Sequence, residues 1–178
     1  MEDNQFLIYK TSPDALSTLK EFVLNDRYGV LDVDEFQTIS KTNWPNASRD
    51  EINDNEFLEL FHSVYWKDYT EWLYSEFPYI QNPKVHNIWY QVYESKDSHD
   101  WHIHEDCHIA NIIYLQLEDD SLITQFKLND QILVPQVKEG DTLVFNPYYT
   151  HRSPINTTST TKIIISFNIS YELLSNCQ

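Results

Sequence analysis

Hydrophobic residues recur along this chain with two different periods, and the first of them is helical. We expect residues 1–80 to form a mainly helical layer, and after Ser48 the apolar positions are spaced by three and four. A helix is expected from Pro13 to about Asn25, because proline fits the first helical turn and Ser12 precedes it as an N-cap. A longer helix is expected to begin after Ser48 and to end at Pro78.

The apolar face of this longer helix is rich in aromatic residues. Its members are Ile52, Phe57, Leu58, Leu60, Phe61, Val64, Tyr65, Tyr69, Trp72 and Leu73. Such a stripe is more typical of a helix that packs against a sheet than of a ligand groove. We therefore expect the helical layer to cover one face of a sheet.

From residue 85 onward the pattern changes to short runs that are typical of β-strands. The runs cover 85–94, 101–104, 109–117, 122–128, 132–137, 142–146 and 162–170, and turn residues separate them. Strands in this number after a helical layer predict a mainly β protein with an N-terminal α layer, folded as a double-stranded β-helix, a jelly-roll or cupin-like barrel. We expect a single domain over 1–178, with 1–80 as the mainly helical layer and 85–170 as the barrel core.

Composition removes several classes of function. The two glycines, Gly29 and Gly140, are too few for a dinucleotide fingerprint or a phosphate-binding loop. A net charge of −16 makes binding to nucleic acid unexpected without assistance, because phosphate contacts need clustered Lys and Arg. Two cysteines without a CxxC pair provide no disulfide framework and no thiolate zinc site. With no apolar N-terminal run in the sequence, we expect no membrane span and a cytoplasmic protein.

Potential metal ligands concentrate in one short segment. His102, His104 and Asp106 alternate along a predicted strand, so their side chains would leave the same face. His151 follows the strand-like run 142–146. Two neighbouring ligands and one distant histidine are how a 2-His-1-carboxylate site for Fe(II) is assembled on a small barrel. The alternative, a polar loop that carries surface histidines, is disfavoured because apolar residues alternate with them.

Three blocks of this region resemble a group of iron(II)/2-oxoglutarate oxygenases that is frequent in marine bacteria and phages. Residues 101–115, Trp-His-Ile-His-Glu-Asp-Cys-His-Ile-Ala-Asn-Ile-Ile-Tyr-Leu, are similar to its motif His-x-His-Pro-Asn-Ser-x-x-Ser-Gly-Val-Tyr-Tyr-Leu. Residues 139–156 are similar to Gly-Asp-Leu-x-Leu-Phe-Pro-Ser-x-x-x-His, and residues 162–168 to a final Arg-x-Ser-x-x-Phe-Asn. The resemblance covers roughly 85–170.

The chain departs from these motifs at several positions. Residues 105–107 read Glu-Asp-Cys in place of Pro-Asn-Ser, and residues 110–111 read Ala-Asn in place of Ser-Gly. Lys162 stands where arginine is usual, and Ile164 replaces the serine that follows it in the motif. These departures concern the cosubstrate contacts more than the metal.

The resemblance implies Fe(II) as the metal and 2-oxoglutarate as a small-molecule cosubstrate. Alignment with the group gives His102 and His104 as the proximal ligands, without a carboxylate. The His-x-Asp pattern of the wider superfamily gives His104 and Asp106 instead. His151 is the distal ligand in both registers, and the sequence leaves the choice between them open.

The resemblance also implies a set of cosubstrate-binding residues. It makes Lys162 the cation that pairs with the far carboxylate of 2-oxoglutarate, and Ser166 and Asn168 share the strand parity of that lysine. Tyr93 and Tyr114 are further candidates, each on a predicted barrel strand. The alternatives are a solvated lysine at a sheet edge and tyrosines that serve only packing.

These observations together predict an oxygenase that hydroxylates an unidentified substrate and releases succinate and CO2. Two alternatives stay open. One is a cupin-type metal enzyme that does not use 2-oxoglutarate, and the other is a catalytically degenerate barrel that acts as a binding module. The sequence identifies neither the substrate nor the oligomeric state.

Overall fold

A computed structural model describes residues 5–27, 29–44 and 55–174 of the chain. The helices are α1 (Pro13–Asn25), α3 (Asn55–Phe61), the π-helical turn η1 (His62–Trp66), α4 (Lys67–Glu76) and the 3-10 turn η2 (Asp120–Leu122). The strands are β1 (Phe6–Lys10), β2 (Val30–Val33), β3 (Gln37–Thr42), β4 (Ile80–Tyr93), β5 (Ser98–His102), β6 (Ile109–Gln116), β7 (Gln125–Leu128), β8 (Gln131–Leu133), β9 (Asp141–Phe145), β10 (Thr150–Ser153) and β11 (Lys162–Leu173). No helix in these ranges is long and apolar enough to cross a membrane.

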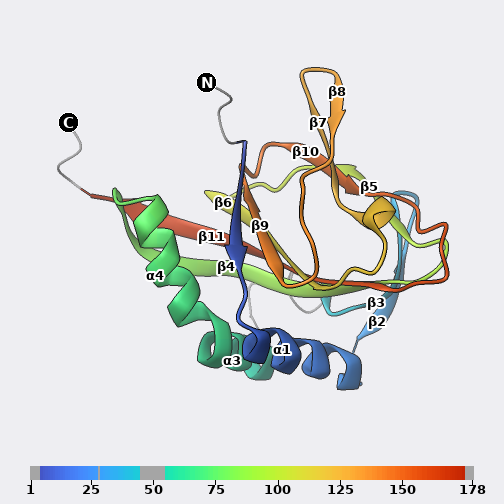
Figure 1. The fold of residues 1–178 in the computed structure, drawn as a ribbon, viewed down its shortest axis with the longest axis horizontal. Helices are drawn as coiled ribbons and strands as arrows, with labels where there is room; N and C mark the ends of the chain where they lie inside the picture. The colour runs from blue at the N-terminus through green and yellow to red at the C-terminus, as the bar shows by residue number, and fades with distance from the viewer. Residues whose placement is uncertain (1–4, 28, 45–54, 175–178) are drawn as a thin grey trace.

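All described strands join one curled antiparallel sheet. Its order is β1-β9-β6-β11-β4-β3-β5-β10-β7-β8, and β2 pairs with β3. In Figure 1 the long strands β4 and β11 cross the whole molecule, and α1, α3 and α4 gather on one side of them. This arrangement confirms the predicted fold, a mainly β double-stranded β-helix with helices on one face.

The segment predicted as a mainly helical layer, residues 1–80, also contributes strands to the sheet. Three strands precede residue 80: β1 pairs with β9, and β3 pairs with both β4 and β5. They are short, and only one residue of β3, Ile39, is a buried hydrophobic, so their periodicity is weak. Helix α1 matches its prediction. The longer helix ends at Glu76 as expected but contains the π-turn η1, and its predicted beginning after Ser48 lies outside the described residues.

Strand β11 separates two hydrophobic cores by simple alternation. Ile163, Ile165 and Phe167 face the helices, and Phe167 packs against the aromatic rings of α3, η1 and α4. Ile164 points the other way, into the barrel interior. Lys162, Ser166 and Asn168 have the same parity as Ile164, so the barrel interior receives the polar residues of this strand.

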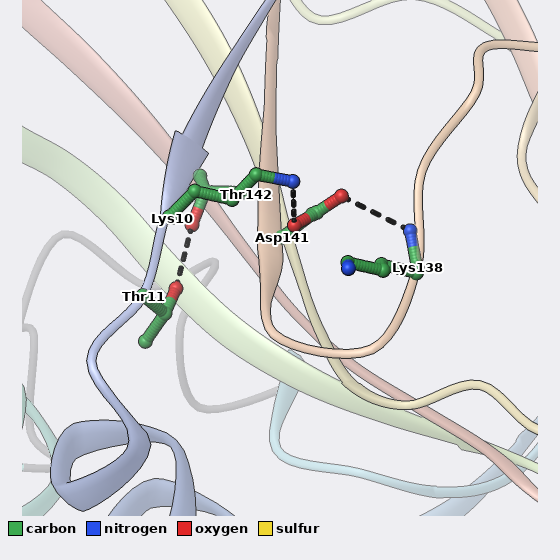
Figure 2. A network of polar contacts seen from close by, with 5 residues as sticks. All are labelled: Lys10, Thr11, Lys138, Asp141 and Thr142. Carbon is green, nitrogen blue, oxygen red and sulfur yellow. Dashed lines mark hydrogen bonds and ion pairs between the residues drawn. The ribbon is translucent and has the colours of Figure 1, made fainter.

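The N-terminal strand is fastened to the barrel by a polar network around Asp141 (Figure 2). Its Oδ1 accepts from Lys10 Nζ at 2.6 Å, and its Oδ2 accepts from the backbone N–H of Lys138 at 3.1 Å. Thr11 and Thr142 share a hydrogen bond of 3.1 Å beside it. Asp141 is buried, so these donors replace the water that its carboxylate loses on folding.

Candidate metal centre

Three histidines converge inside the barrel. Each of His102, His104 and His151 offers one ligand atom, and these atoms lie within 4.8 Å of one another. The ring centroids are 4.2 Å apart for His102 and His151, and 4.9 Å apart for His104 and His151. His104 and His151 are buried and His102 is partly buried, which suits a centre that is open on one side.

Strand pairing explains how distant histidines meet. His151 in β10 is directly opposite His102, the last residue of β5, in an antiparallel pair. His104 follows the end of β5, and its backbone N–H donates to the carbonyl of Pro147 at 2.9 Å. The sequence predicted a strand over 101–104, whereas β5 covers Ser98–His102. His104 is therefore positioned by its backbone hydrogen bond to Pro147 and by the hydrogen bond of its imidazole to Asn168, rather than by strand alternation.

The second nitrogen of each imidazole is held by an oxygen. His104 Nδ1 lies 2.7 Å from Asn168 Oδ1, His102 Nδ1 lies 2.8 Å from the carbonyl of Asp100, and His151 Nδ1 lies 2.8 Å from the carbonyl of Tyr149. Carbonyl oxygens only accept, so Nδ1 carries the proton in all three rings and Nε2 has a free lone pair. Metal-bound histidines are oriented in this way in proteins.

Burial keeps these imidazoles neutral. Burial, opposed by the hydrogen bond to Asn168 and assisted by the neighbouring His102, lowers the pKa of His104 to about 4. Burial, His102 and His104 together hold the pKa of His151 well below its usual value. The pKa of His102 is also lowered by burial. Neutral imidazole is the form that binds a metal, so at neutral pH no proton competes for these sites.

Asp106 stands apart from this group. Its side chain is exposed, and its backbone has a φ of +59°, which belongs to a tight turn rather than a strand. The alternation that would place Asp106 beside His104 requires an extended chain, and the chain leaves the extended conformation at this point. The structure thus brings together His102, His104 and His151, and does not bring Asp106 to them.

Lys162 is a buried cation in the barrel interior. It is 1 % exposed, and Nζ donates to Ser153 Oγ at 3.0 Å. The rings of Tyr93 and Tyr114 lie 5.2 and 5.9 Å from Nζ. Within the described ranges no carboxylate lies at ion-pair distance from this ammonium group. Burial lowers the pKa of Lys162 to about 7, because the charged ammonium form is disfavoured where it has no counter-charge.

The other predicted cosubstrate residues also lie in the interior. Tyr93 and Tyr114 are buried, and burial raises the pKa of Tyr114 to about 12. Ser166 is buried and lies 3.4 Å from Gln91 Oε1. The amide oxygen of Asn168 is engaged by His104, so this residue supports the histidine group directly.

A fourth histidine, His99, was not among the predicted site residues. Its ring stacks on that of His102, with centroids 3.9 Å apart and planes within 12°. His99 pairs with Ser153 while His102 pairs with His151, so between these pairs two residues of β5 oppose one residue of β10. This bulge turns His99 and His102 to the same side, although they are three positions apart. Strand periodicity gives no signal for it.

Two cavities meet at the histidines. The inner cavity is lined by His102, His104, His151, Tyr93, Ser153 and Ser166, among others, and has a volume of about 20 Å³. The outer cavity has a volume of about 410 Å³ and opens beside His102 and His104. Trp89, Gln91 and His99 line both, so the outer cavity leads to the histidine group.

Comparison with solved structures shows similarity of fold. No family model and no curated protein sequence matches the chain. An oxidoreductase of the 2OG-Fe(II) oxygenase family from Burkholderia pseudomallei matches with a TM-score of 0.74 and 8% identity, over 94% of this chain and 85% of that chain. The viral collagen prolyl hydroxylase of Paramecium bursaria Chlorella virus-1, solved as a 2OG complex, matches with a TM-score of 0.62 and 12% identity, over 93% and 95%.

A third match involves a protein solved with a peptide. The prolyl hydroxylase of Trichoplax adhaerens, in complex with a fragment of the hypoxia inducible factor oxygen degradation domain, has a TM-score of 0.66 and 14% identity, over 94% of this chain and 84% of that chain. At such low identities these matches establish a shared double-stranded β-helix. The chemistry of this chain has to be argued from its own residues.

Proposed function

We propose that the chain is an Fe(II)- and 2-oxoglutarate-dependent oxygenase that hydroxylates a substrate C–H bond, with succinate and CO2 as co-products. In this proposal His102, His104 and His151 hold the metal, and Lys162 binds the far carboxylate of 2-oxoglutarate. The observation that carries it is the presence in one barrel interior of three pre-oriented imidazoles and a buried cation without an ion-pair partner. Ser153, which accepts a hydrogen bond from Lys162 Nζ, lines the same small cavity as the three histidines. The fold that the chain shares with 2OG-Fe(II) oxygenases supports the same assignment.

The donor set fits Fe(II). Imidazole suits iron, and three nitrogens that point to one space leave other coordination positions for small molecules. Three neutral histidines give no negative charge to the centre, unlike a set with one carboxylate. An anionic cosubstrate would therefore provide the compensating charge.

Lys162 fits a carboxylate in the same way. A buried ammonium group with one hydroxyl partner is costly, and an anion in contact with it removes that cost. Ser153 and Tyr93 lie beside this cation and also line the inner cavity, so they indicate where the carboxylate would lie. The inner cavity holds about one water molecule, so its lining side chains have to move when 2-oxoglutarate enters.

Each group has a separate part in the reaction. Iron and 2-oxoglutarate, when bound, would reduce O2, with one oxygen atom going to succinate and the other to the substrate. The histidines hold the metal in a fixed orientation through their Nδ1–H bonds. Lys162 orients the cosubstrate, and the side chains of Ile112 and Ile164 form the apolar part of the inner cavity's wall.

A second candidate function is favoured by the same ligand set. Three histidines without a carboxylate also suit a cupin-type metal enzyme that does not use 2-oxoglutarate. This alternative requires no anion at Lys162, so it predicts that the Lys162→Met substitution leaves turnover intact. Under our proposal the same substitution abolishes 2-oxoglutarate binding.

Anaerobic titration with Fe(II) and 2-oxoglutarate tests the assignment. The chelated complex is expected to give a metal-to-ligand charge-transfer band. His102→Ala, His104→Ala and His151→Ala should abolish the band, and Asp106→Ala, the matched control in the same segment, should retain it. Loss of the band in Asp106→Ala together with its retention in His102→Ala would favour the His104 and Asp106 register instead.

A further inference from the structure

The outer cavity is lined by acidic residues from two sides. Asp32 and Asp34 belong to the β2–β3 hairpin, and Asp100 and Glu105 belong to β5 and the segment after it. No lysine or arginine is among its lining residues, and no ion pair in the described part of the chain involves these four carboxylates. Burial and the carboxylate of Asp34 raise the pKa of Asp32, as expected for anions without a counter-charge.

Their hydrogen-bond donors are neutral groups. Asp34 Oδ1 accepts from the backbone N–H groups of Phe36 and Gln37, at 2.7 and 3.0 Å. Asp32 Oδ2 accepts from the side chain of Gln37 at 2.7 Å, and Asp100 Oδ1 accepts from its neighbour's N–H. These bonds fix the positions of the carboxylates but leave their negative charge in place.

Aromatic rings form the rest of the wall. Phe36, Trp44, Trp89 and Trp101 line the cavity, and the rings of Trp44 and Trp89 lie 4.6 Å apart. Arg152, which borders a neighbouring hollow, places its guanidinium 4.5 Å from the ring of Trp101. That contact shows that the indole of Trp101 accepts a cation on one face.

One buried acceptor in this wall has no donor. Asn87 is among the residues that line the outer cavity, and its buried Oδ1 makes no hydrogen bond to any described residue. A buried amide oxygen without a partner is costly. The cavity therefore combines negative charge, aromatic faces and an unsatisfied acceptor, and all three properties suit a ligand with N–H donors and a positive charge.

We propose that the substrate of this site carries an ammonium or guanidinium group on an aliphatic chain, the chemistry of lysine and arginine side chains. The inference rests on the proposed function, since the outer cavity is the route to the histidine group. The charged end would lie among the carboxylates and indoles, and the aliphatic part would extend toward His102 and His104. An inorganic cation would not use the aromatic half of the wall.

Binding of matched probes tests this. The probes are Nα-acetyl-lysine methylamide, its arginine counterpart, the neutral norleucine counterpart, and a short Gly/Ser peptide with one central lysine or norleucine. Quenching of tryptophan fluorescence reports binding to the protein with Fe(II) and 2-oxoglutarate under anaerobic conditions. We expect a cationic probe to bind about tenfold more tightly than its neutral counterpart. The two formats distinguish recognition of a single capped residue from recognition of a residue within a longer polypeptide.

A double variant tests whether the carboxylates of the outer cavity cause the preference for cationic probes. Asp32→Asn with Glu105→Gln should reduce the preference to less than about threefold, because it removes one charge from each side of the cavity. Asp130→Asn, an exposed carboxylate in the β7–β8 turn, is the matched control and should retain it.

The outcomes separate this inference from the proposed function. Equal binding of charged and neutral probes, no binding of any probe, or a preference unchanged in the double variant would overturn the inference even where the charge-transfer band forms. If the band is absent and the preference is present, the cation site stands and the oxygenase proposal fails.

Discussion

Asn168 connects the last strand of the barrel to the candidate metal centre. Its side-chain oxygen is the acceptor for His104 Nδ1 at 2.7 Å, and both residues are buried. His102 and His151 are held by backbone carbonyls, which substitution of a side chain does not remove. His104 is thus the candidate ligand whose orientation depends on one replaceable side chain.

Removal of this acceptor should weaken metal binding. Asn168→Ala is expected to lower the affinity for Fe(II) by about 10–100-fold, because the ring of His104 loses its fixed orientation. Asn168→Asp keeps an acceptor oxygen and should retain most of the affinity. Competition with a chromophoric chelator measures both, with Ser166→Ala, on the same face of β11, as the control. Wild-type affinity in Asn168→Ala would mean that His104 is not a ligand.

If Lys162 binds 2-oxoglutarate as proposed, the affinity for this cosubstrate should depend on pH. Its pKa of about 7 means that the ammonium form dominates below pH 7 and is lost as the pH rises above it. A bound carboxylate favours the charged form, so above pH 7 binding of 2-oxoglutarate takes up a proton. We expect the affinity to fall by up to about tenfold per pH unit above 7, and to be flat below it as far as this group is concerned.

Calorimetry from pH 6 to 9 in the presence of Fe(II) measures this dependence. Lys162→Arg is the matched variant, because guanidinium stays charged throughout this range. It should bind 2-oxoglutarate without proton uptake. A wild-type profile that is as flat as that of Lys162→Arg would show that Lys162 does not meet the cosubstrate.

Among the elements, α4 is joined to the sheet by a buried polar contact as well as by packing. Tyr69 donates its hydroxyl to Asn111 Oδ1 at 2.6 Å, and the amide of Asn111 donates to the carbonyl of Phe167 at 3.1 Å. These groups lie on the outer face of the sheet, where the helices cover β6 and β11. The contact fixes the helix relative to the strands that carry Lys162 and Asn168.

Tyr69→Phe tests the strength of this joint. The substitution leaves the ring in place but deprives the buried Asn111 Oδ1 of its donor, which should reduce the free energy of unfolding by about 1–3 kcal/mol. Tyr74→Phe, on the same helix with 43% of its surface exposed, should change it by less than about 0.5 kcal/mol. Urea denaturation followed by circular dichroism measures both, and equal stability of the two variants would contradict this account.

Elements with strong periodicity were predictable from the sequence, and those shaped by tertiary contacts were not. In strand β11 the resemblance indicated Lys162, and strand parity with this lysine then indicated Ser166 and Asn168. Helix α1 has an N-cap and a proline, and both of its ends were predicted. Strand β10, which carries His151, has four residues and no hydrophobic pattern, and it forms because β5 and β7 pair with it on both sides.

Some residues of the candidate site were likewise predictable from the sequence, and others were not. His104 and His151 were expected together in either register, and the structure brings them together. The choice of third partner depends on the backbone after β5, where Asp106 adopts a positive φ and the chain turns away. No local pattern in the sequence signals this turn. His99 depends on a bulge between two paired strands, which a single strand's sequence cannot specify.

At the scale of the whole molecule, the two halves of the sheet are supported differently. The helices pack against β4, β6 and β11. The histidine group belongs to the other half, where β5 and β10 pair with each other and Figure 1 shows no helix of α1, α3 or α4 over them. A metal ion held by both strands would join them by bonds that packing does not provide. Metal binding should therefore contribute measurably to global stability.

Thermal unfolding with and without Fe(II) under anaerobic conditions measures this contribution. At a free ion concentration of 100 times Kd, the free energy of unfolding should rise by about 2.7 kcal/mol, because the unfolded chain lacks the assembled site. For a chain of this size the corresponding rise in Tm is about 5–10 °C. His151→Ala should show no rise, since β10 then contributes no ligand, and EDTA should reverse the rise in the wild type. A rise that persists in His151→Ala would place the stabilising ion at surface carboxylates instead of in the barrel.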